Sequence, residues 1–153
     1  MKTELSLIAV AAALALPGLA EARPITVTTE LDNYGGRGAY LAVYVTDAAG
    51  TYQGTLYVAG RKSRYFRHLS DWARAGGSAA DGSTGASVGS GRTLTVSVDL
   101  ADALFDAGYE IHVDVAVEDM RDSPSDAVVP LTTAGAGQPV AGRSYVQSLR
   151  YDM

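Results

Sequence analysis

The stretch YEIHVDVAVED, from Tyr109 to Asp119, decides the fold class, because apolar and polar residues alternate along it. One face of an extended chain would carry only branched apolar side chains here: Ile111, Val113, Val115 and Val117. The opposite face would carry His112, Asp114 and Glu118. A period of two residues is that of a β-strand with one buried face and one face in water. We therefore predict a half-buried strand, with its polar face exposed to solvent.

Six further segments show similar alternation and predict further short strands. They span residues 25–31, 39–47, 54–60, 94–98, 127–133 and 144–151. In residues 39–47, for example, Leu41 and Val43 share one face while Tyr40 and Ala42 share the other. About seven short strands in about 130 residues are typical of an immunoglobulin-like antiparallel sandwich. The expected fold class is therefore all-β.

The segment YFRHLSDWARA, residues 65–75, departs from the alternating pattern. Its apolar residues Phe66, Leu69 and Trp72 recur every three residues, which predicts one short helix that docks through a single face. Two glycines follow directly and would end the helix. We expect this helix to cover one end of the sandwich.

The N-terminal residues differ in kind from the rest of the chain. Lys2 precedes the apolar run LSLIAVAAALAL, and small residues follow at Ala20 and Ala22. This order is that of a secretory signal peptide. We predict a signal peptide over residues 1–22, with cleavage after Ala20 as the alternative. Residues 23–153 would then form a single domain that is periplasmic or secreted.

The composition limits the classes of partner and site. The chain contains no cysteine, so neither a disulfide framework nor a thiolate metal site is available. Its formal net charge of −5 argues against a nucleic-acid partner, whose phosphates require clustered basic residues. No segment after the signal peptide approaches the roughly 20 apolar residues of a membrane helix. We expect no membrane span in the mature chain.

Two patterns that suggest catalysis or metal binding lack the necessary context. Residues 85–89 match the G-x-S-x-G nucleophile elbow, but that elbow needs a buried strand before the serine and a helix after it. Here a polar loop precedes and a strand follows. His112 with Asp114, or His68, could ligate a metal, but their spacing is that of no recognised ligand set. We expect these groups to be exposed polar residues, and no metal site.

Four tyrosines occur in two neighbouring predicted strands and their connection: Tyr40, Tyr44, Tyr52 and Tyr57. They could line a ligand-binding surface. Tyrosine is also common on half-buried strands, where it needs no ligand. Both interpretations remain open at this point.

The stretch ADGSTGASVGSGR, residues 80–92, is the longest without a strand or helix pattern. Its composition is that of a flexible connector rich in glycine and serine. Such connectors usually join domains, however, and this chain predicts a single domain. A long irregular connection within a compact domain is often functional.

Three stretches resemble one family: YLAVYVTDAAGTYQGTLYV, RYFRHLSDWARA and DGSTGAS. Together they are similar to the predicted periplasmic family catalogued as domain of unknown function 2271. In that family a strand pair with an Asp-x-x-Gly turn leads to a Tyr-x-Arg-x-Leu-x-x-Trp helix and then to an Asp-x-x-Thr-Gly-Ala-Thr/Ser loop. The resemblance implies a periplasmic location and a β-rich fold.

The loop is also similar to the motif at which FMN transferases attach flavin mononucleotide (FMN) through a phosphoester. The resemblance implies that Ser87, the last hydroxyl residue of DGSTGAS, is the acceptor. The remaining motif positions would form the cofactor-binding frame: Asp81, Gly82, Thr84, Gly85 and Ala86. The small residues would keep bulk away from the acceptor. Asp81 would help to position the acceptor or the transferase's metal, and Thr84 would hold the turn.

Two functions from different classes follow from these patterns. A flavinylated domain would carry electrons between periplasmic or membrane redox partners, with an FMN transferase as its modifying partner and no substrate of its own. A domain without flavin would be a secreted interaction or ligand-binding module. Both functions are compatible with the same sandwich, so the fold does not choose between them.

Overall fold

The computed structural model describes residues 21–79 and 84–153. Over these residues the chain forms eight strands, with short helices between some of them. The strands are β1 (Ala22–Leu31), β2 (Tyr40–Thr46), β3 (Tyr52–Ala59), β4 (Thr84–Gly85), β5 (Thr93–Ala101), β6 (Glu110–Ala116), β7 (Ser123–Pro130) and β8 (Val146–Asp152). All seven predicted strands are present, and the two-residue strand β4 is the addition.

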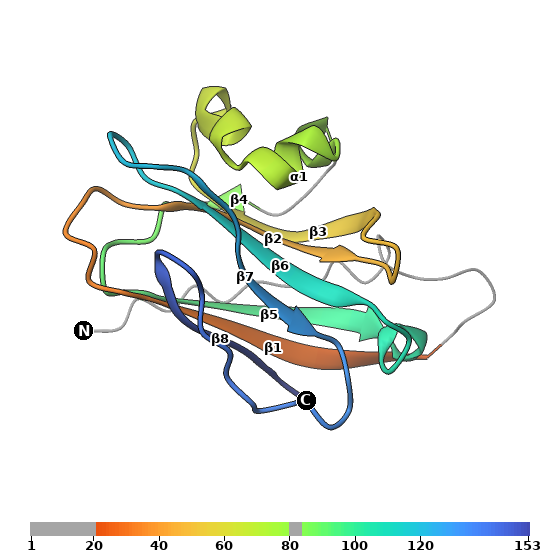
Figure 1. The fold of residues 1–153 in the computed structure, drawn as a ribbon. Helices are drawn as coiled ribbons and strands as arrows, with labels where there is room; N and C mark the ends of the chain where they lie inside the picture. Colours follow the sequence, from red (N-terminus) through yellow and green to blue (C-terminus); the bar gives the residue numbers. More distant parts are fainter. Residues whose placement is uncertain (1–20, 80–83) are drawn as a thin grey trace.

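The strands form two sheets that pack face to face (Figure 1). One sheet has the order β5-β1-β8 and the other has the order β4-β3-β2-β6-β7. The pairs are antiparallel except for β3 with β4, which are parallel. The predicted all-β sandwich is therefore confirmed.

The apolar residues of the alternating segments form the core between the two sheets. On β6, Ile111, Val113 and Val115 are fully buried, and they belong to the same apolar cluster as Val27 of β1 and Leu94 of β5. Removing such branched side chains from water is the main favourable contribution to folding. The period-two pattern thus identified the inward face correctly.

The helical segment lies over the outer face of the five-stranded sheet, and not over an end of the sandwich as predicted (Figure 1). It consists of a 3-10 helix η2 (Ser63–His68) followed by the helix α1 (Ser70–Arg74). Ala42 and Val58, on the outer face of the sheet, are buried in one cluster with Leu69 and Trp72. The outer face is apolar at its centre, and covering that area is what places the helices there.

Trp72 is the central contact between the helical layer and the sheet. Its side chain is 2% exposed, and the indole Nε1 donates a hydrogen bond of 2.9 Å to the Thr55 hydroxyl of β3. The Phe66 ring packs edge-on against it at 5.5 Å. A Cβ atom on Gly77 would lie 2.2 Å from the indole nitrogen, so only glycine fits there. The predicted docking through Phe66, Leu69 and Trp72 is confirmed.

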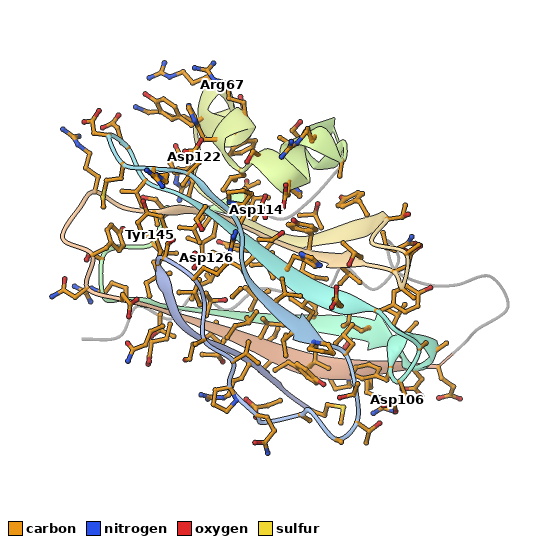
Figure 2. The ribbon with its side chains drawn as sticks, viewed as in Figure 1. Arg67, Asp106, Asp114, Asp122, Asp126 and Tyr145 are labelled. Atoms are coloured by element: carbon orange, nitrogen blue, oxygen red, sulfur yellow. The ribbon has the colours of Figure 1, made fainter. Side chains whose placement is uncertain are left out.

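The carboxylate of Asp114 also holds the helical layer against the five-stranded sheet. Asp114 is fully buried, which corrects the expectation that this face of β6 is exposed to solvent. Its Oδ2 accepts the backbone N–H of Trp72 at 2.8 Å. Its Oδ1 accepts the Tyr44 hydroxyl at 2.8 Å and the backbone N–H of Ser125 at 2.7 Å. One side chain of β6 therefore connects α1, β2 and β7 (Figure 2).

A second buried carboxylate, that of Asp126 on β7, fixes the entry into β8 (Figure 2). Its two oxygens accept the backbone N–H groups of Ser144, Tyr145 and Val146 at 2.7 to 3.1 Å. The chain then enters β8, which pairs with β1. These bonds satisfy backbone donors at a point where the chain crosses from one sheet to the other.

The segment after residue 83 is ordered by pairing and is not a slack connector. Thr84 and Gly85 form β4 beside β3, and Val88 pairs with Ala39 and enters the core. Residues 80–83 lie outside the described part of the chain.

The predicted signal peptide falls almost entirely on residues 1–20, which lie outside the described residues. Strand β1 begins at Ala22, so cleavage after that residue would leave Arg23 in the strand. The Arg23 guanidinium contacts the Asp102 carboxylate at 2.5 Å. Within residues 21–79 and 84–153, no helix is long and apolar enough to cross a membrane.

Replacement of Trp72 by alanine should lower the free energy of unfolding by about 3–5 kcal/mol, because it leaves a large cavity between helix and sheet. Urea denaturation followed by circular dichroism measures this loss. Trp72→Phe serves as the control: it keeps an aromatic ring but removes the indole N–H, so it should lose less. A loss below about 1 kcal/mol for Trp72→Ala would contradict the described packing.

Replacement of Asp114 by asparagine should destabilise the fold by about 1–3 kcal/mol, because the amide places an NH2 group, which cannot accept a hydrogen bond, where one of the two carboxyl oxygens accepts one. Burial raises the pKa of Asp114 above its ordinary value of 3.8. The folded protein therefore binds this proton more tightly than the unfolded chain does. This tighter proton binding stabilises the folded protein. The stabilisation is fully present when the pH is below the ordinary pKa of 3.8, and it is lost as the pH rises through the pKa of the folded state.

Denaturation of wild type and Asp114→Asn between pH 3 and 7 tests this account, since all other carboxylates are common to both proteins. The difference in unfolding free energy should narrow as the pH rises. The exposed Asp32→Asn is the matched control and should change stability by no more than about 0.5 kcal/mol. A difference that widens with pH would mean that the carboxylate's pKa is lowered by folding.

Candidate functional site

Ser87 lies on a short exposed segment that is held at both ends. On one side, the backbone N–H of Gly60 donates to the Gly85 carbonyl at 2.7 Å. On the other side, Val88 and Ala39 exchange two backbone hydrogen bonds of 2.6 and 2.9 Å. Ser87 itself is exposed, and within the described chain its hydroxyl has no hydrogen-bond partner. The exposed hydroxyl thus stands on a backbone that is fixed by pairing on both sides.

The neighbouring predicted site residues fall into two groups. Thr84 and Ala86 are exposed, and the Thr84 hydroxyl makes no hydrogen bond to any residue in the described ranges. Asp81 and Gly82 lie outside those ranges. By contrast, the hydroxyl of nearby Ser90 is engaged, because it donates to Asn33 and accepts the N–H of Gly35.

Two glycines leave the space that this arrangement requires. A Cβ atom on Gly85 would lie 1.9 Å from the Tyr57 hydroxyl, so the tyrosine fits beneath β4 only because residue 85 has no side chain. A Cβ atom on Gly38 would lie 2.5 Å from the Ser87 hydroxyl oxygen. The Ser87 hydroxyl therefore lies against Gly38, on the connection between β1 and β2, where a larger residue would collide with it.

Ser87 belongs to the wall of a cavity of about 510 Å³. Four separate parts of the chain form this cavity: the connection before β2, the segment that contains η2, the segment of Ser87, and the connection between β6 and β7. The last of these projects beside the helical layer in Figure 1. Its lining also includes Arg37, Tyr40, Lys62, Tyr65, His68, Glu118, Asp119, Met120 and Asp122.

The two sides of the cavity carry opposite charges. The positive charges are those of Arg37 and Lys62, which lie with His68 on the side of β2 and η2, and acidic residues lie on the connection between β6 and β7. Arg37 contacts Glu118 at 3.0 Å, and His68 contacts Asp122 at 3.0 Å. Lys62 makes no ion pair within the described ranges.

Two tyrosines give the cavity an aromatic surface. The rings of Tyr40 and Tyr65 meet edge-on at 5.8 Å, and the Arg64 guanidinium lies 4.9 Å from the centre of the Tyr65 ring. The backbone N–H of Lys62 donates to the Tyr40 hydroxyl at 3.0 Å, which holds the start of η2 against β2. The aromatic wall is thus fixed before any ligand binds.

The four tyrosines considered as a ligand surface do not lie together. Tyr40 lines the cavity beside Ser87, whereas Tyr44 and Tyr52 line a separate hollow of about 360 Å³ next to α1. Tyr57 is 1% exposed and belongs to the core between the sheets. Only Tyr40 is therefore placed to contact a group on Ser87.

The histidines also have structural partners. His112 is stacked on Tyr44, its Nδ1 lies 3.0 Å from the Ser125 hydroxyl, and its Nε2 lies 3.1 Å from the Thr46 hydroxyl. Asp114 is occupied by backbone and tyrosine donors, as described above. In the described part of the chain, no group of three or more His, Cys, Asp and Glu side chains could hold a metal ion.

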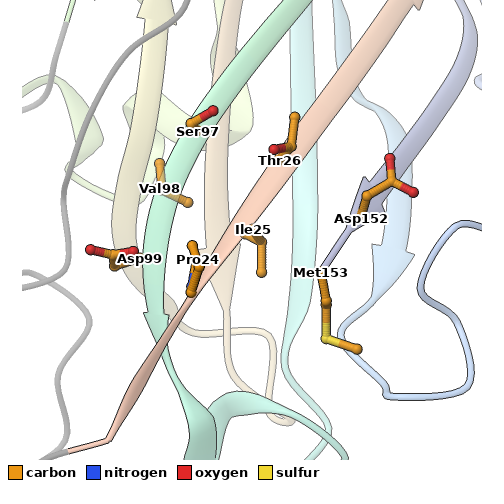
Figure 3. A pocket seen from close by; sticks show the side chains of 8 residues that line it. All are labelled: Pro24, Ile25, Thr26, Ser97, Val98, Asp99, Asp152 and Met153. Atoms are coloured by element: carbon orange, nitrogen blue, oxygen red, sulfur yellow. The ribbon is translucent and has the colours of Figure 1, made fainter.

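Another hollow, of about 340 Å³, lies on the three-stranded sheet across β1 and β5 and beside the end of β8 (Figure 3). Its lining includes the carboxylates of Asp99 and Asp152 and no aromatic or basic side chain. It has neither the aromatic surface nor the cations of the cavity beside Ser87. The latter is the candidate functional site.

Most of the residues that line this cavity could not be identified from the sequence. Arg37, Lys62 and Met120 come from segments far apart in the sequence, and no spacing rule predicts that they meet. One signal was present: the segment RKSRYFR, residues 61–67, contains four basic residues in an otherwise acidic chain. All four are exposed in the structure, namely Arg61, Lys62, Arg64 and Arg67.

The family of the chain follows from comparison with known proteins. The family model described as "Predicted periplasmic protein (DUF2271)" matches residues 22–148, which span β1 to the first residues of β8. No curated protein and no solved structure matches the chain. The family's periplasmic location agrees with the export expected from the N-terminal sequence. The match covers far more than half of the chain, and this protein therefore belongs to the DUF2271 family of predicted periplasmic proteins.

Proposed function

We propose that this protein is a periplasmic electron carrier that bears FMN covalently on Ser87. The supporting observation is the exposed Ser87 hydroxyl, which has no partner in the described ranges and stands on a fixed backbone at the wall of a large cavity. A modifying enzyme needs an accessible nucleophile. A cofactor that must exchange electrons needs a defined position beside the protein surface.

The attachment is a phosphoryl transfer from a flavin dinucleotide, catalysed by an FMN transferase. The Ser87 oxygen attacks the phosphorus atom next to the flavin, and the bond from that phosphorus to the nucleoside monophosphate breaks. The nucleoside monophosphate leaves with the electron pair, and the hydroxyl proton passes to a base of the transferase. The product is a phosphodiester with one negative charge, and no electron is gained or lost in the step.

The residues around Ser87 fit such a phosphodiester. The Ser87 hydroxyl lies against Gly38, which has no side chain to obstruct it, and Arg37 precedes that glycine in the cavity wall. Arg37 contacts Glu118 through its Nε, and its other guanidinium N–H groups could donate charge-assisted hydrogen bonds to the phosphodiester. The flavin would supply reversible electron transfer. The protein would hold it and tune its surroundings.

Intact-protein mass spectrometry after co-expression with an FMN transferase tests the proposal. Wild type should gain the mass of FMN less water, because one ester bond forms. Ser87→Ala should gain nothing, since no oxygen remains at that position, whereas Ser87→Thr should gain the same mass as wild type. The variants should unfold within about 0.5 kcal/mol of wild type, because the side chain is exposed.

Added mass that survives Ser87→Ala would place the flavin elsewhere, and the exposed Thr84 would be the next acceptor to replace. Absence of added mass on the wild type, beside a positive control substrate for the same transferase, would contradict flavinylation. The function would then be that of a binding module without flavin.

A further inference from the structure

We infer that the cavity beside Ser87 is a docking site for the flavin ring, which lies between Tyr65 on η2 and Met120 on the connection between β6 and β7. The inference rests on the proposed attachment at Ser87 and adds the position of the ring. The ring system of FMN is flat, aromatic and apolar on its two faces, with carbonyl and N–H groups along one edge. The cavity has surfaces of both kinds.

The attachment point and the cavity are joined. Ser87 is itself a lining residue, so any group on its oxygen starts at the cavity wall. The backbone pairing of Gly85 and Val88 prevents the serine from carrying that group away from the cavity. The volume of about 510 Å³ lies within the range of about 300–1,000 Å³ typical of small-molecule sites.

Met120 is the observation that points to a flat apolar ligand. It is 39% exposed, one of two large apolar side chains exposed in the described chain, and it lines this cavity. Its sulfur would lie 2.7 Å from a Cβ atom on Gly36, so the lack of a side chain there lets it pack against the connection before β2. A thioether contacts aromatic rings favourably, and a bound ring would cover this exposed surface.

Tyr65 provides an aromatic surface on the helical side of the cavity. Its position is set by Tyr40 beneath it and by the Arg64 guanidinium over its ring. Aromatic rings prefer offset or edge-on contact with a second ring, which Tyr65 can offer to a planar ligand. Because these neighbours already fix the tyrosine, little side-chain entropy is lost when the ligand docks.

Lys62 provides a polar contact for the edge of the ring. Lys62 lines the cavity and makes no ion pair with a residue in the described ranges, and its ammonium group can donate to ring carbonyl oxygens. A positive charge beside the ring also stabilises the electrons that the ring accepts. Lys62 should therefore make the bound flavin easier to reduce than FMN in water.

The test uses full-length protein loaded with flavin, with the mass of each sample verified beforehand. A ring that contacts a tyrosine loses fluorescence by rapid electron transfer from the phenol, and a ring held in a chiral site shows circular dichroism in its visible bands. The folded wild type should show several-fold weaker flavin fluorescence than its proteolytic digest, together with visible dichroism. Lys62→Gln should lower the reduction potential.

Tyr65→Ala should recover most of the fluorescence and lose the visible dichroism while keeping the added mass. Tyr65→Phe preserves the ring but removes the phenol, so it should recover fluorescence and keep dichroism. Tyr52→Ala is the matched control. Tyr52, on β3, is half-buried like Tyr65 but lines the hollow next to α1 and not the cavity beside Ser87. It should leave both signals as in wild type.

The two proposals fail in different ways. Wild type that carries the added mass but is as fluorescent as its digest and has no visible dichroism would overturn ring docking and leave attachment at Ser87 intact. Equal effects of Tyr52→Ala and Tyr65→Ala would also overturn it, because the change would then reflect general loosening of the helical layer. Absence of the added mass would overturn both proposals.

Discussion

The buried carboxylate of Asp114 is the interaction on which the outer half of this molecule depends. A five-residue helix has too few internal hydrogen bonds to be stable alone, so α1 exists because the sheet holds it. Two hydrogen bonds hold it: the backbone N–H of Trp72 donates to the Asp114 carboxylate, and the Trp72 indole N–H donates to the Thr55 hydroxyl. Removal of the Asp114 carboxylate would leave buried N–H and O–H groups without acceptors. The free-energy cost of such unpaired groups exceeds the net gain from the hydrogen bonds that they lose.

The position of the cavity follows from that attachment. Helix α1 directly follows η2, and η2 carries Tyr65 and His68 into the cavity wall. The same carboxylate accepts the N–H of Ser125 at the start of β7, which fixes the end of the opposite wall. The backbone of Ser125 has a φ of 45°, a conformation that a non-glycine residue adopts at some cost. The hydrogen bond to Asp114 offsets that cost.

The sequence predicted the sandwich well, because burial of one strand face imposes a period of two on every strand. It also predicted the docking face of the helical segment, where Leu69 and Trp72 follow a helical spacing. It misplaced Asp114, because an outward-pointing carboxylate is normally exposed and only the apolar residues Ala42 and Val58 hinted that this face is covered. Strand β4 was missed because two residues paired at a sheet edge leave no periodic pattern.

The candidate site was predictable only in part. Ser87 could be identified from its motif, whereas Gly38, Tyr65 and Met120 could not, because they meet through the fold and not through spacing. The structure also gives Gly85 a packing reason: the Tyr57 hydroxyl occupies the space of its missing side chain. Gly85 therefore has a role in the packing of the fold that does not depend on the motif.

Amide hydrogen exchange at Trp72 and Ser125 tests the central claim most directly. Both backbone N–H groups donate to a buried side chain rather than to a regular ladder, so their protection reports on the Asp114 contact itself. They should exchange as slowly as the amides of β6 in the core, through global unfolding only. Exchange of the Trp72 amide at the rate of an unstructured peptide, beside a protected β6, would contradict the account.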